Sequence, residues 1–368
     1  MPNAPVKTDL AARLDLHGPL IQAPMAGGAT TPELVAAVSN AGALGSLGGA
    51  YLRPDELASS IRRIKSLTRR PFAVNLFAPC PEPAISRRQL EAAVEATQIY
   101  RRELGIADPE VRPPYLPDFE EQFSLVLGER PAVFSFTFGV PDRRRLQECR
   151  ERGILTIGTA TTVDEGLALQ DAGVDAVVAQ GAEAGAQRGT FAPEKPDPFL
   201  GLAALVPMLA SKLRIPVIAA GGIMNGQGIA AALALGAAAA QLGTAFLACE
   251  ECGIAKIYRD ALLNPERKTT RLTRAFTGRW ARGLENRFIL EMAAREEAIL
   301  PFPAQNAFTQ DIRKQAAQLA LPDFLSLWAG QGVDLIRAMK AEALVKTLFK
   351  ETAEAIASLQ SSRADVSA

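Results

Sequence analysis

Two glycine-rich stretches of the sequence have the composition of a phosphate-binding site. They are 219–223, AAGGI, and 241–244, QLGT. Each closes a short apolar run and precedes a helix-like segment. Glycine lets the backbone approach an anion closely, and the first N–H groups of a following helix attract negative charge. The residues that we expect to bind a phosphate group are Gly221, Gly222, Gln241, Leu242, Gly243 and Thr244. A plain tight turn at the glycine pair is the alternative.

A second set of candidate residues could hold a planar heterocycle. Segment 180–191, QGAEAGAQRGTF, has three glycines with amide and charged side chains between them. This composition makes a poor helix and a poor strand, and it is typical of a loop around a ligand. Asn75 ends another apolar run, and its amide can both donate and accept hydrogen bonds.

The elements that would position these residues alternate along the chain. Apolar runs at 20–23, 43–46, 72–76, 132–136, 154–157, 176–180, 217–220 and 239–242 predict strands. Segments 32–40, 54–65, 142–152, 163–172, 199–212 and 226–235 predict helices between them. Strands separated by helices pair in parallel, and eight such units favour a closed (β/α)8 TIM barrel. In such a barrel the site lies at the carboxyl ends of the strands.

Two segments depart from this alternation. Residues 79–130 contain a proline cluster and a charged helix, 87–104, which predicts an insertion after the third strand. Near the carboxyl end we expect a strand at 273–277 and helices at 285–298, 307–319 and 333–359. The predicted domains are therefore a barrel over 1–265 and a smaller, mainly helical substrate or cover domain over 266–368.

Composition excludes several classes of function. The 40 basic and 40 acidic side chains cancel, which argues against nucleic acid and acidic membranes as partners. The sole histidine, His17, excludes most zinc sites, so no metal is expected. Four cysteines in 368 residues do not make a disulfide framework, and no signal peptide or membrane span is predicted. We therefore expect a cytoplasmic protein, and we leave a homodimer open.

Several motifs in order resemble the nitronate monooxygenase family, formerly called 2-nitropropane dioxygenase, whose members are FMN-dependent TIM-barrel enzymes. Besides the segments above, the resemblance rests on 22–28 QAPMAGG, 39–45 SNAGALG, 276–279 FTGR, 282–286 RGLEN and 326–332 SLWAGQG. It covers almost the whole chain. The resemblance implies an FMN-dependent oxidoreductase whose substrates are a nitronate or nitroalkane and O2.

The resemblance also assigns roles to individual residues. Asn75 and Gln180 resemble the family's contacts to the isoalloxazine and ribityl chain. Met25 resembles the residue after the first strand that packs beside the flavin. The family's backbone cradle for the ribityl chain and phosphate corresponds to Gly185, Gly222 and the segment from Gln241 to Thr244.

One departure from the family pattern concerns catalysis. The family's loop usually reads GGHRG, and its histidine is a candidate base near the flavin, whereas 185–189 here reads GAQRG. Gln187 therefore stands in place of that histidine. A glutamine amide cannot abstract a carbon-bound proton at neutral pH, although it can donate a hydrogen bond. A nitronate is already deprotonated, so we expect oxidation of nitronates to carbonyl compound and nitrite to persist and activity on neutral nitroalkanes to be weak.

Two other functions remain open at this point. One is an NAD(P)H-dependent flavin reductase that acts on a quinone or an enoyl thioester. The other is a flavin-binding protein without turnover, an alternative that rests on the missing histidine.

Overall fold

The computed structural model describes residues 6–266 and 269–366. The predicted domains, 1–265 and 266–368, each include residues outside this part of the chain.

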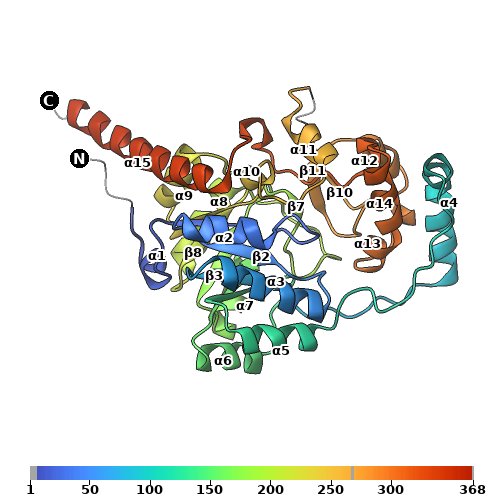
Figure 1. Cartoon of the computed structure of the whole chain (residues 1–368), viewed down its shortest axis with the longest axis horizontal. Coiled ribbons are helices and arrows are strands. Elements are labelled where there is room, and N and C mark those ends of the chain that lie inside the picture. The colour runs from blue at the N-terminus through green and yellow to red at the C-terminus, as the bar shows by residue number, and fades with distance from the viewer. Residues whose placement is uncertain (1–5, 267–268, 367–368) are drawn as a thin grey trace.

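Eight parallel strands form the barrel that the sequence predicts (Figure 1). In chain order they are β1 (Leu20–Gln22), β2 (Gly45–Gly48), β3 (Phe72–Phe77), β4 (Val133–Thr137), β5 (Leu155–Ala160), β6 (Ala176–Gln180), β8 (Val217–Ala220) and β9 (Ala239–Leu242). The order around the barrel is β1-β9-β8-β6-β5-β4-β3-β2. A parallel bridge between Ile21 and Leu44 joins its two ends, and the Gln22 N–H donates to the Leu44 carbonyl at 2.9 Å. The TIM barrel is confirmed.

Helices surround this barrel. Those between consecutive strands are α2 (Pro32–Asn40), α3 (Pro54–Leu67), α5 (Phe119–Glu129), α6 (Arg143–Glu151), α7 (Val163–Ala172), α8 (Leu202–Lys212) and α9 (Gly226–Ala234). The six predicted helices are all present, with small shifts at their ends. The largest shift is at α8, which was expected from residue 199: Phe199 has a φ of 46°, and Gly201 is the N-cap.

The barrel interior has an apolar end and a polar end. Side chains of the apolar layer are Ile21, Leu44, Ala73, Val133, Ile157, Val178, Ile218 and Ala239. Leu10 and Leu14, from helix α1 (Asp9–Arg13) and its C-cap, join this layer and close the amino-terminal end. Because side chains alternate between the two faces of a strand, the next inward positions are two residues further on. Several of these are polar, and they face the carboxyl-terminal mouth.

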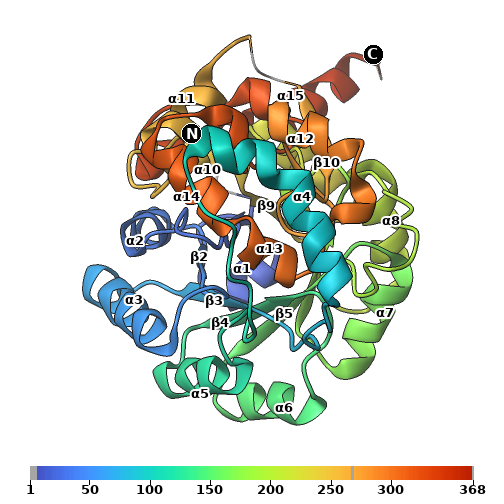
Figure 2. The ribbon, with the colours of Figure 1, turned by 90° about the vertical axis from the view of Figure 1, so that its right-hand side faces the viewer.

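The insertion after β3 contributes helix α4 (Arg87–Leu104), which has the predicted bounds. Figure 2 shows α4 in front of the strands, together with helices from the carboxyl-terminal part of the chain. Arg101 of α4 is 1% exposed and bonds both oxygens of Asp311, at 2.6 and 3.3 Å. This ion pair fastens the insertion to the carboxyl-terminal helices.

The carboxyl-terminal part contains short elements between β9 and the last helix. They are α10 (Thr244–Leu247), α11 (Lys256–Leu263), β10 (Thr270–Thr273), β11 (Ala281–Leu284), α12 (Arg287–Ala293), η1 (Glu296–Ala298), α13 (Ala304–Phe308), α14 (Gln310–Gln318), η2 (Pro322–Phe324) and η3 (Val333–Leu335). The strand expected at 273–277 was misplaced: β10 occupies 270–273 and shares only Thr273 with it, and residues 274–277 are not in a strand. The helices expected at 285–298 and 307–319 are each divided in two.

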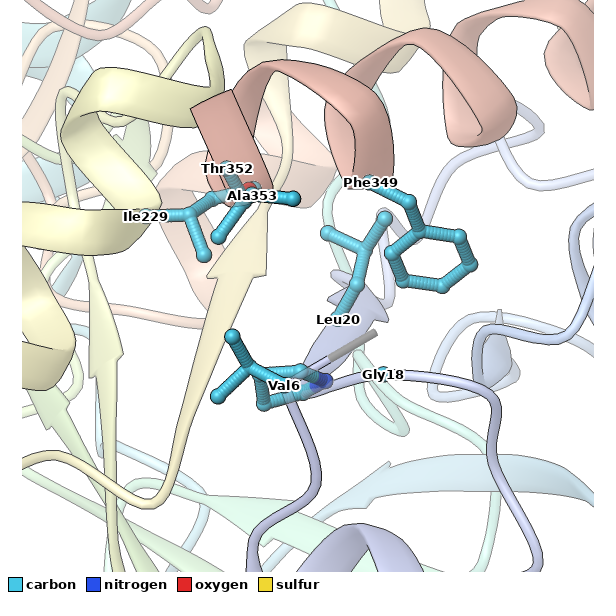
Figure 3. A pocket seen from close by; sticks show the side chains of 8 residues that line it. Val6, Gly18, Leu20, Ile229, Phe349, Thr352 and Ala353 are labelled. Carbon is cyan, nitrogen blue, oxygen red and sulfur yellow. The ribbon is translucent and has the colours of Figure 1, made fainter. Parts of the chain in front are cut away.

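The last helix, α15 (Ala341–Val366), begins eight residues later than residue 333, where the sequence predicted it. The backbone is extended at Ile336, so the short helix η3 ends there and does not continue into α15; the Arg337 side chain bonds the Met224 carbonyl and the Glu351 carboxylate. Helix α15 lies beside α9 and α2. Figure 3 shows Phe349 and Ile229 around a small, mainly apolar pocket there. The carboxyl terminus thus supplies the outer helix next to β1.

Among residues 6–266 and 269–366, none of the helices combines the length and apolar character that crossing a bilayer requires.

Candidate functional site

Three amide side chains lie at the polar end of the barrel interior. Each amide comes two positions after an apolar residue of the barrel interior on the same strand, so it also points inward. The three are Asn75, Gln180 and Gln241. The register places Gln180 beside Ala220, and Ala220 beside Gln241. The Asn75 Nδ2 donates to the Ser135 hydroxyl at 3.0 Å. Because side chains alternate along each strand, amides up to 166 residues apart in sequence lie at the same end of the barrel. This end is the carboxyl-terminal mouth, where TIM barrels carry their active sites.

Gln180 shapes the loop that follows β6. Its Nε2 donates to the Gln187 carbonyl at 3.1 Å, and its Oε1 accepts from the Gly189 N–H at 2.7 Å. The amide thus closes the loop on itself, although a carbonyl oxygen retains a second lone pair for another donor. Gln180 is a loop-fixing residue as well as a candidate ligand contact.

Glycines bring three loops into backbone contact at the same mouth. A Cβ on Gly185 would lie 2.6 Å from the Gly330 nitrogen, and one on Gly332 would lie 2.4 Å from the Gly222 oxygen. Gly221 and Gly222 have φ of 133° and 67°, which few other residues adopt. The loops after β6 and β8 and the loop at 330–332 therefore form one backbone-lined cradle.

The threonine after β9 is part of this cradle. The Thr244 hydroxyl accepts from the Gly330 N–H at 2.9 Å, which leaves its own proton to donate. A Cβ on Gly243 would lie 3.8 Å from the Met25 Sδ, so Met25 and Gly243 are neighbours across β1 and β9. Leu242 is 1% exposed, so only its backbone can reach a ligand.

The helices after β8 and β9 do not offer the N–H groups that the sequence suggested. At α9 the Gly226 N–H donates to the Glu351 carboxylate at 2.9 Å, and the Gly228 N–H donates to the Asn225 side chain. Helix α10 has only four residues. An anion in the cradle would have to be held by loop backbone and by the Thr244 hydroxyl.

The position of Gln187 is fixed by a short strand that the sequence did not predict. Strand β7 (Ala186–Gln187) pairs with β11, and β11 pairs with β10. The Tyr51 hydroxyl donates to the Gln187 Oε1 at 3.4 Å. Within the described part of the chain, the buried Gln187 Nε2 has no hydrogen-bond partner. An unpaired buried donor is costly, so the Gln187 Nε2 is free to donate to an acceptor that the protein itself does not supply.

Arg188 does not lie at the surface, and its side chain is engaged within the protein. Its side chain is 1% exposed and forms two hydrogen bonds with Asp197, at 2.9 and 3.1 Å, and a third with the Gln180 carbonyl. Bidentate geometry of this kind is that of a strong buried ion pair. Arg188 therefore holds the loop in place.

The sole histidine lies at the other end of the barrel. The His17 N–H donates to the Gly42 carbonyl at 2.8 Å, and both residues precede the strands next to them, β1 and β2. His17 therefore lies at the amino-terminal end of the barrel, away from Gln187 and the carboxyl-terminal mouth.

An aromatic and cationic wall at the mouth was not predicted from the sequence. Phe77 and Phe138, at the ends of β3 and β4, pack on each other and on Phe302, with centroids 4.5 to 6.0 Å apart. The Arg279 guanidinium lies over the Phe138 ring at 3.9 Å from its centroid. Burial raises the pKa of Tyr51 well above its usual value, so this hydroxyl stays protonated. The sequence signal that could have indicated this wall is the position of Tyr51 and Phe138 just after the ends of strands.

Comparison with known proteins assigns the chain to a family. The family model described as nitronate monooxygenase matches residues 11–351. A probable nitronate monooxygenase of Staphylococcus saprophyticus is 40% identical over 351 residues, which cover 95% of this chain and 98% of that protein. The chain belongs to the nitronate monooxygenase family. Family membership confirms the prediction that it is an oxidoreductase.

Solved structures agree with this assignment. The nitroalkane oxidase of Streptomyces ansochromogenes is 41% identical, with a TM-score of 0.88 over 95% of this chain and 99% of that one. FabK of Thermotoga maritima is 28% identical, with a TM-score of 0.74 over 97% and 99%. Members of the nitronate monooxygenase family and FabK thus share this barrel and its carboxyl-terminal part.

No group of three or more potential metal ligands occurs among the residues that the structure describes.

Proposed function

We propose that the protein is an FMN-dependent monooxygenase that oxidises alkyl nitronates with O2 to a carbonyl compound and nitrite. The observation that carries the proposal is Gln187. An amide stands where the family's histidine is expected, and His17 lies at the opposite end of the barrel. A chain without this base is suited to a substrate that is already deprotonated.

The residues at the mouth fit FMN. Glycines at 185, 221 and 222 let the loops of the cradle approach one another closely, since Cβ atoms there would press on Gly330, Ala184 and Glu183, and Gly243 and Thr244 adjoin these loops. In this proposal the cradle holds the ribityl phosphate, while Asn75, Gln180 and Gln241 bond the polar edge of the ring and the ribityl hydroxyls. Met25 packs beside the cofactor, and Leu242 contributes its backbone. When bound, FMN would supply the electron-transfer chemistry between substrate and O2.

Gln187 would orient the substrate. Its unpaired Nε2 can donate to a nitronate oxygen, while Tyr51 and the β7–β11 pairing hold the residue in place. The amide does not move a proton, because it has no pKa in the useful range.

Replacing Gln187 by histidine tests this account. Gln187→His supplies a base. We therefore expect the rate of oxidation of a neutral nitroalkane to rise by about 10²-fold, the contribution typical of general base catalysis. The rate on the matching nitronate should change little. Oxygen consumption at pH 8 measures both, and Gln187→Asn is the control that keeps an amide. If both variants oxidise the nitroalkane at the rate of the unmodified protein, the role given to position 187 is refuted.

An NAD(P)H-dependent flavin reductase is the second candidate, favoured by the likeness to FabK. Anaerobic addition of NADH to the FMN-loaded protein distinguishes the two. Bleaching of the flavin at a rate that supports turnover with a quinone or an enoyl thioester would favour the reductase. Absence of turnover with every substrate would favour a flavin-binding protein without catalysis.

We further propose that the protein acts in the cytoplasm on small molecules, with a homodimer as one assembly to test. In support, Cys80, Cys149, Cys249 and Cys252 are all free thiols, as expected in a reducing compartment.

A further inference from the structure

Four aromatic side chains gather at the carboxyl-terminal mouth. Tyr51 follows β2, Phe77 ends β3, Phe138 follows β4, and Phe302 belongs to the segment between η1 and α13. The centroid of the Phe77 ring lies 5.2 Å from that of Tyr51, 4.5 Å from that of Phe138 and 6.0 Å from that of Phe302. The ring planes meet at 45° to 87°, as in the tilted and edge-to-face pairs that aromatic rings prefer. We call these four residues the aromatic cluster.

The aromatic cluster is separate from the apolar cores of the protein. None of its four residues belongs to the core clusters formed within residues 6–266 and 269–366. Tyr51, Phe77 and Phe302 are half-buried, so part of each of these side chains faces solvent. Aromatic surface of this kind, with a few polar groups beside it, is typical of a small-molecule site.

A buried amide fixes the loop that carries Tyr51. Gln122 of α5 is 3% exposed, and its Nε2 donates to the carbonyls of Gly49 at 3.2 Å and Leu52 at 2.7 Å. These carbonyls lie on either side of Tyr51 in the chain. The protein itself therefore sets the position of the tyrosine ring.

The FTGR motif at 276–279 positions two further rings of the cluster. A Cβ on Gly278 would lie 2.6 Å from the Phe302 nitrogen, so a glycine is needed for the segment of Phe302 to lie this close. The next residue, Arg279, lies over the Phe138 ring at 3.9 Å from its centroid and donates to the Thr190 carbonyl in the loop after β6. The motif thus connects both rings to that loop.

The backbone of Phe138 is strained. Its φ of 78° lies in the left-handed region, which a bulky side chain rarely adopts. Residues held in such conformations concentrate at active sites and ligand clamps, where the surrounding structure maintains the strain. Here the strained conformation keeps the Phe138 ring between Phe77 and Arg279.

A polar donor adjoins the aromatic cluster. The Tyr51 hydroxyl donates to the Gln187 Oε1 at 3.4 Å, and the buried Gln187 Nε2 has no hydrogen-bond partner among the residues that the structure describes. A ligand oxygen that accepts from this nitrogen therefore has aromatic rings beside it. The site is suited to a molecule that combines an acceptor oxygen with an aromatic ring.

We propose that the aromatic cluster binds the organic substituent of the substrate and selects an aromatic ring there. The inference rests on the proposed function and names its substrate class, which is nitronates whose carbon chain carries an aryl group. A nitronate oxygen accepts from the Gln187 Nε2, and the aryl ring packs edge-to-face on the half-buried rings of Phe77 and Phe302. One additional contact of this kind raises affinity by about threefold to tenfold beyond the effect of burial.

Two inert carboxylates test the proposal on the unmodified, FMN-loaded protein. The pair is 3-phenylpropanoate and 3-cyclohexylpropanoate, which share a planar oxyanion and a chain and differ only in the ring. The cyclohexyl ring is the more apolar one, so a preference for phenyl cannot come from burial alone. We expect 3-phenylpropanoate to bind about fivefold more tightly. The readouts are the shift in melting temperature and the change in flavin absorption on titration.

Ring-removing variants locate this preference. Phe77→Leu and Phe302→Leu each keep an apolar side chain but remove a ring, and each should reduce the preference to below about twofold. Phe302→Tyr keeps the ring and should keep the preference. The control is Phe119→Leu, which removes a half-buried ring of the outer helix α5 that stacks on Phe123. The comparison of the two carboxylates uses the unmodified protein, so it does not depend on the folding of a variant.

Oxygen uptake with two nitronates extends the test to turnover. The nitronates of (2-nitroethyl)benzene and (2-nitroethyl)cyclohexane differ only in the ring, which a methylene group separates from the reacting carbon. We expect kcat/KM to be about fivefold higher for the aryl compound, through a lower KM at a similar kcat.

Equal affinity for the two carboxylates, or binding of neither, would overturn the inference even if nitronates are oxidised. Loss of FMN from both leucine variants with an unchanged preference would assign the cluster to the cofactor and would also overturn it. Conversely, a ring-dependent preference for 3-phenylpropanoate without oxidation of any nitronate would support the aromatic site and refute the proposed function. The two failures are therefore distinguishable.

Discussion

Arg188 shows how a residue can be placed near a site by sequence and yet serve the scaffold. It adjoins Gln187 in the loop, but its guanidinium is turned away and buried against Asp197. The ion pair, the Gln180 amide and Glu165 hold the two ends of the loop. The unpaired Gln187 Nε2 is available to a ligand because these neighbours fix the backbone around it.

Replacing Asp197 by asparagine should destabilise the protein strongly. Asp197→Asn leaves the Arg188 charge buried and uncompensated, which costs about 3–5 kcal/mol in the free energy of unfolding. Chemical denaturation measures the loss, and Glu194→Gln, an exposed carboxylate of the same segment, is the control. A loss below 1 kcal/mol in Asp197→Asn would mean that the pair does not hold the loop.

The residues of the cradle were predictable, whereas the cationic wall was not. A glycine at the end of a predicted strand indicates a tight turn or a close backbone approach. Gly221, Gly222 and Gly243 could therefore be identified as candidates from the sequence alone. Arg279 belongs to the FTGR motif, to which the sequence assigned no role, and Arg313 lies in a segment that looks like an ordinary amphipathic helix. The contact of Arg279 with Phe138 joins distant parts of the chain, and no local pattern marks it.

At the scale of elements, Glu351 connects the last helix to the barrel. Its carboxylate accepts the first N–H of α9 and pairs with Arg337, which also bonds the Met224 carbonyl. These contacts keep the pKa of Glu351 below its usual value, although burial acts in the opposite direction. The same contacts leave the start of α9 unavailable to a phosphate.

Glu351→Gln should lower the free energy of unfolding by about 1 kcal/mol, because it removes the negative charge at the amino terminus of α9. The control is Glu354→Gln, an exposed residue of the same helix that pairs with Lys350 at 3.7 Å. Urea denaturation of both variants gives the comparison. Equal stabilities of the two variants would exclude a capping role for Glu351.

Periodic elements were predicted well and irregular ones poorly. Apolar runs located all eight barrel strands, and α4 was found with the observed bounds. Strand β7 has two residues, and no local pattern marks it because it exists only through pairing with β11. The start of α15 was misplaced because Arg337 and its partners override a helical sequence pattern.

For the molecule as a whole, buried thiols predict how stability depends on pH. Burial raises the pKa of Cys149 and of Cys249 to about 12, from an ordinary value of 9.0. Between these values the native protein keeps protons that the unfolded chain loses, so stability falls as the pH rises. Arg279, whose pKa is lowered, opposes this only above about pH 10.

Urea denaturation at pH 8, 9 and 10 tests this dependence. We expect the free energy of unfolding to decrease above pH 9, by at most about 1.4 kcal/mol per pH unit for each thiol. The double variant Cys149→Ala, Cys249→Ala should show a flatter dependence. An identical slope in the variant would assign the effect to other groups.

The complete molecule combines a barrel that presents amides and glycines with a carboxyl-terminal part that presents cations. Strand β11 pairs with the loop after β6, and Arg279 lies over Phe138 at the end of β4, so both parts of the chain contribute to the mouth. The family assignment explains the barrel and its cradle. The proposed preference for ionised over neutral substrates rests on Gln187, which stands at the position of the family's histidine.

The most direct test of the account is oxygen uptake by the FMN-loaded protein with an alkyl nitronate and, separately, with the same compound as neutral nitroalkane. The account predicts rapid uptake and nitrite release with the nitronate, and a far lower rate with the nitroalkane. Comparable rates with the two forms would contradict the role of Gln187, and no uptake with either would contradict the proposed function.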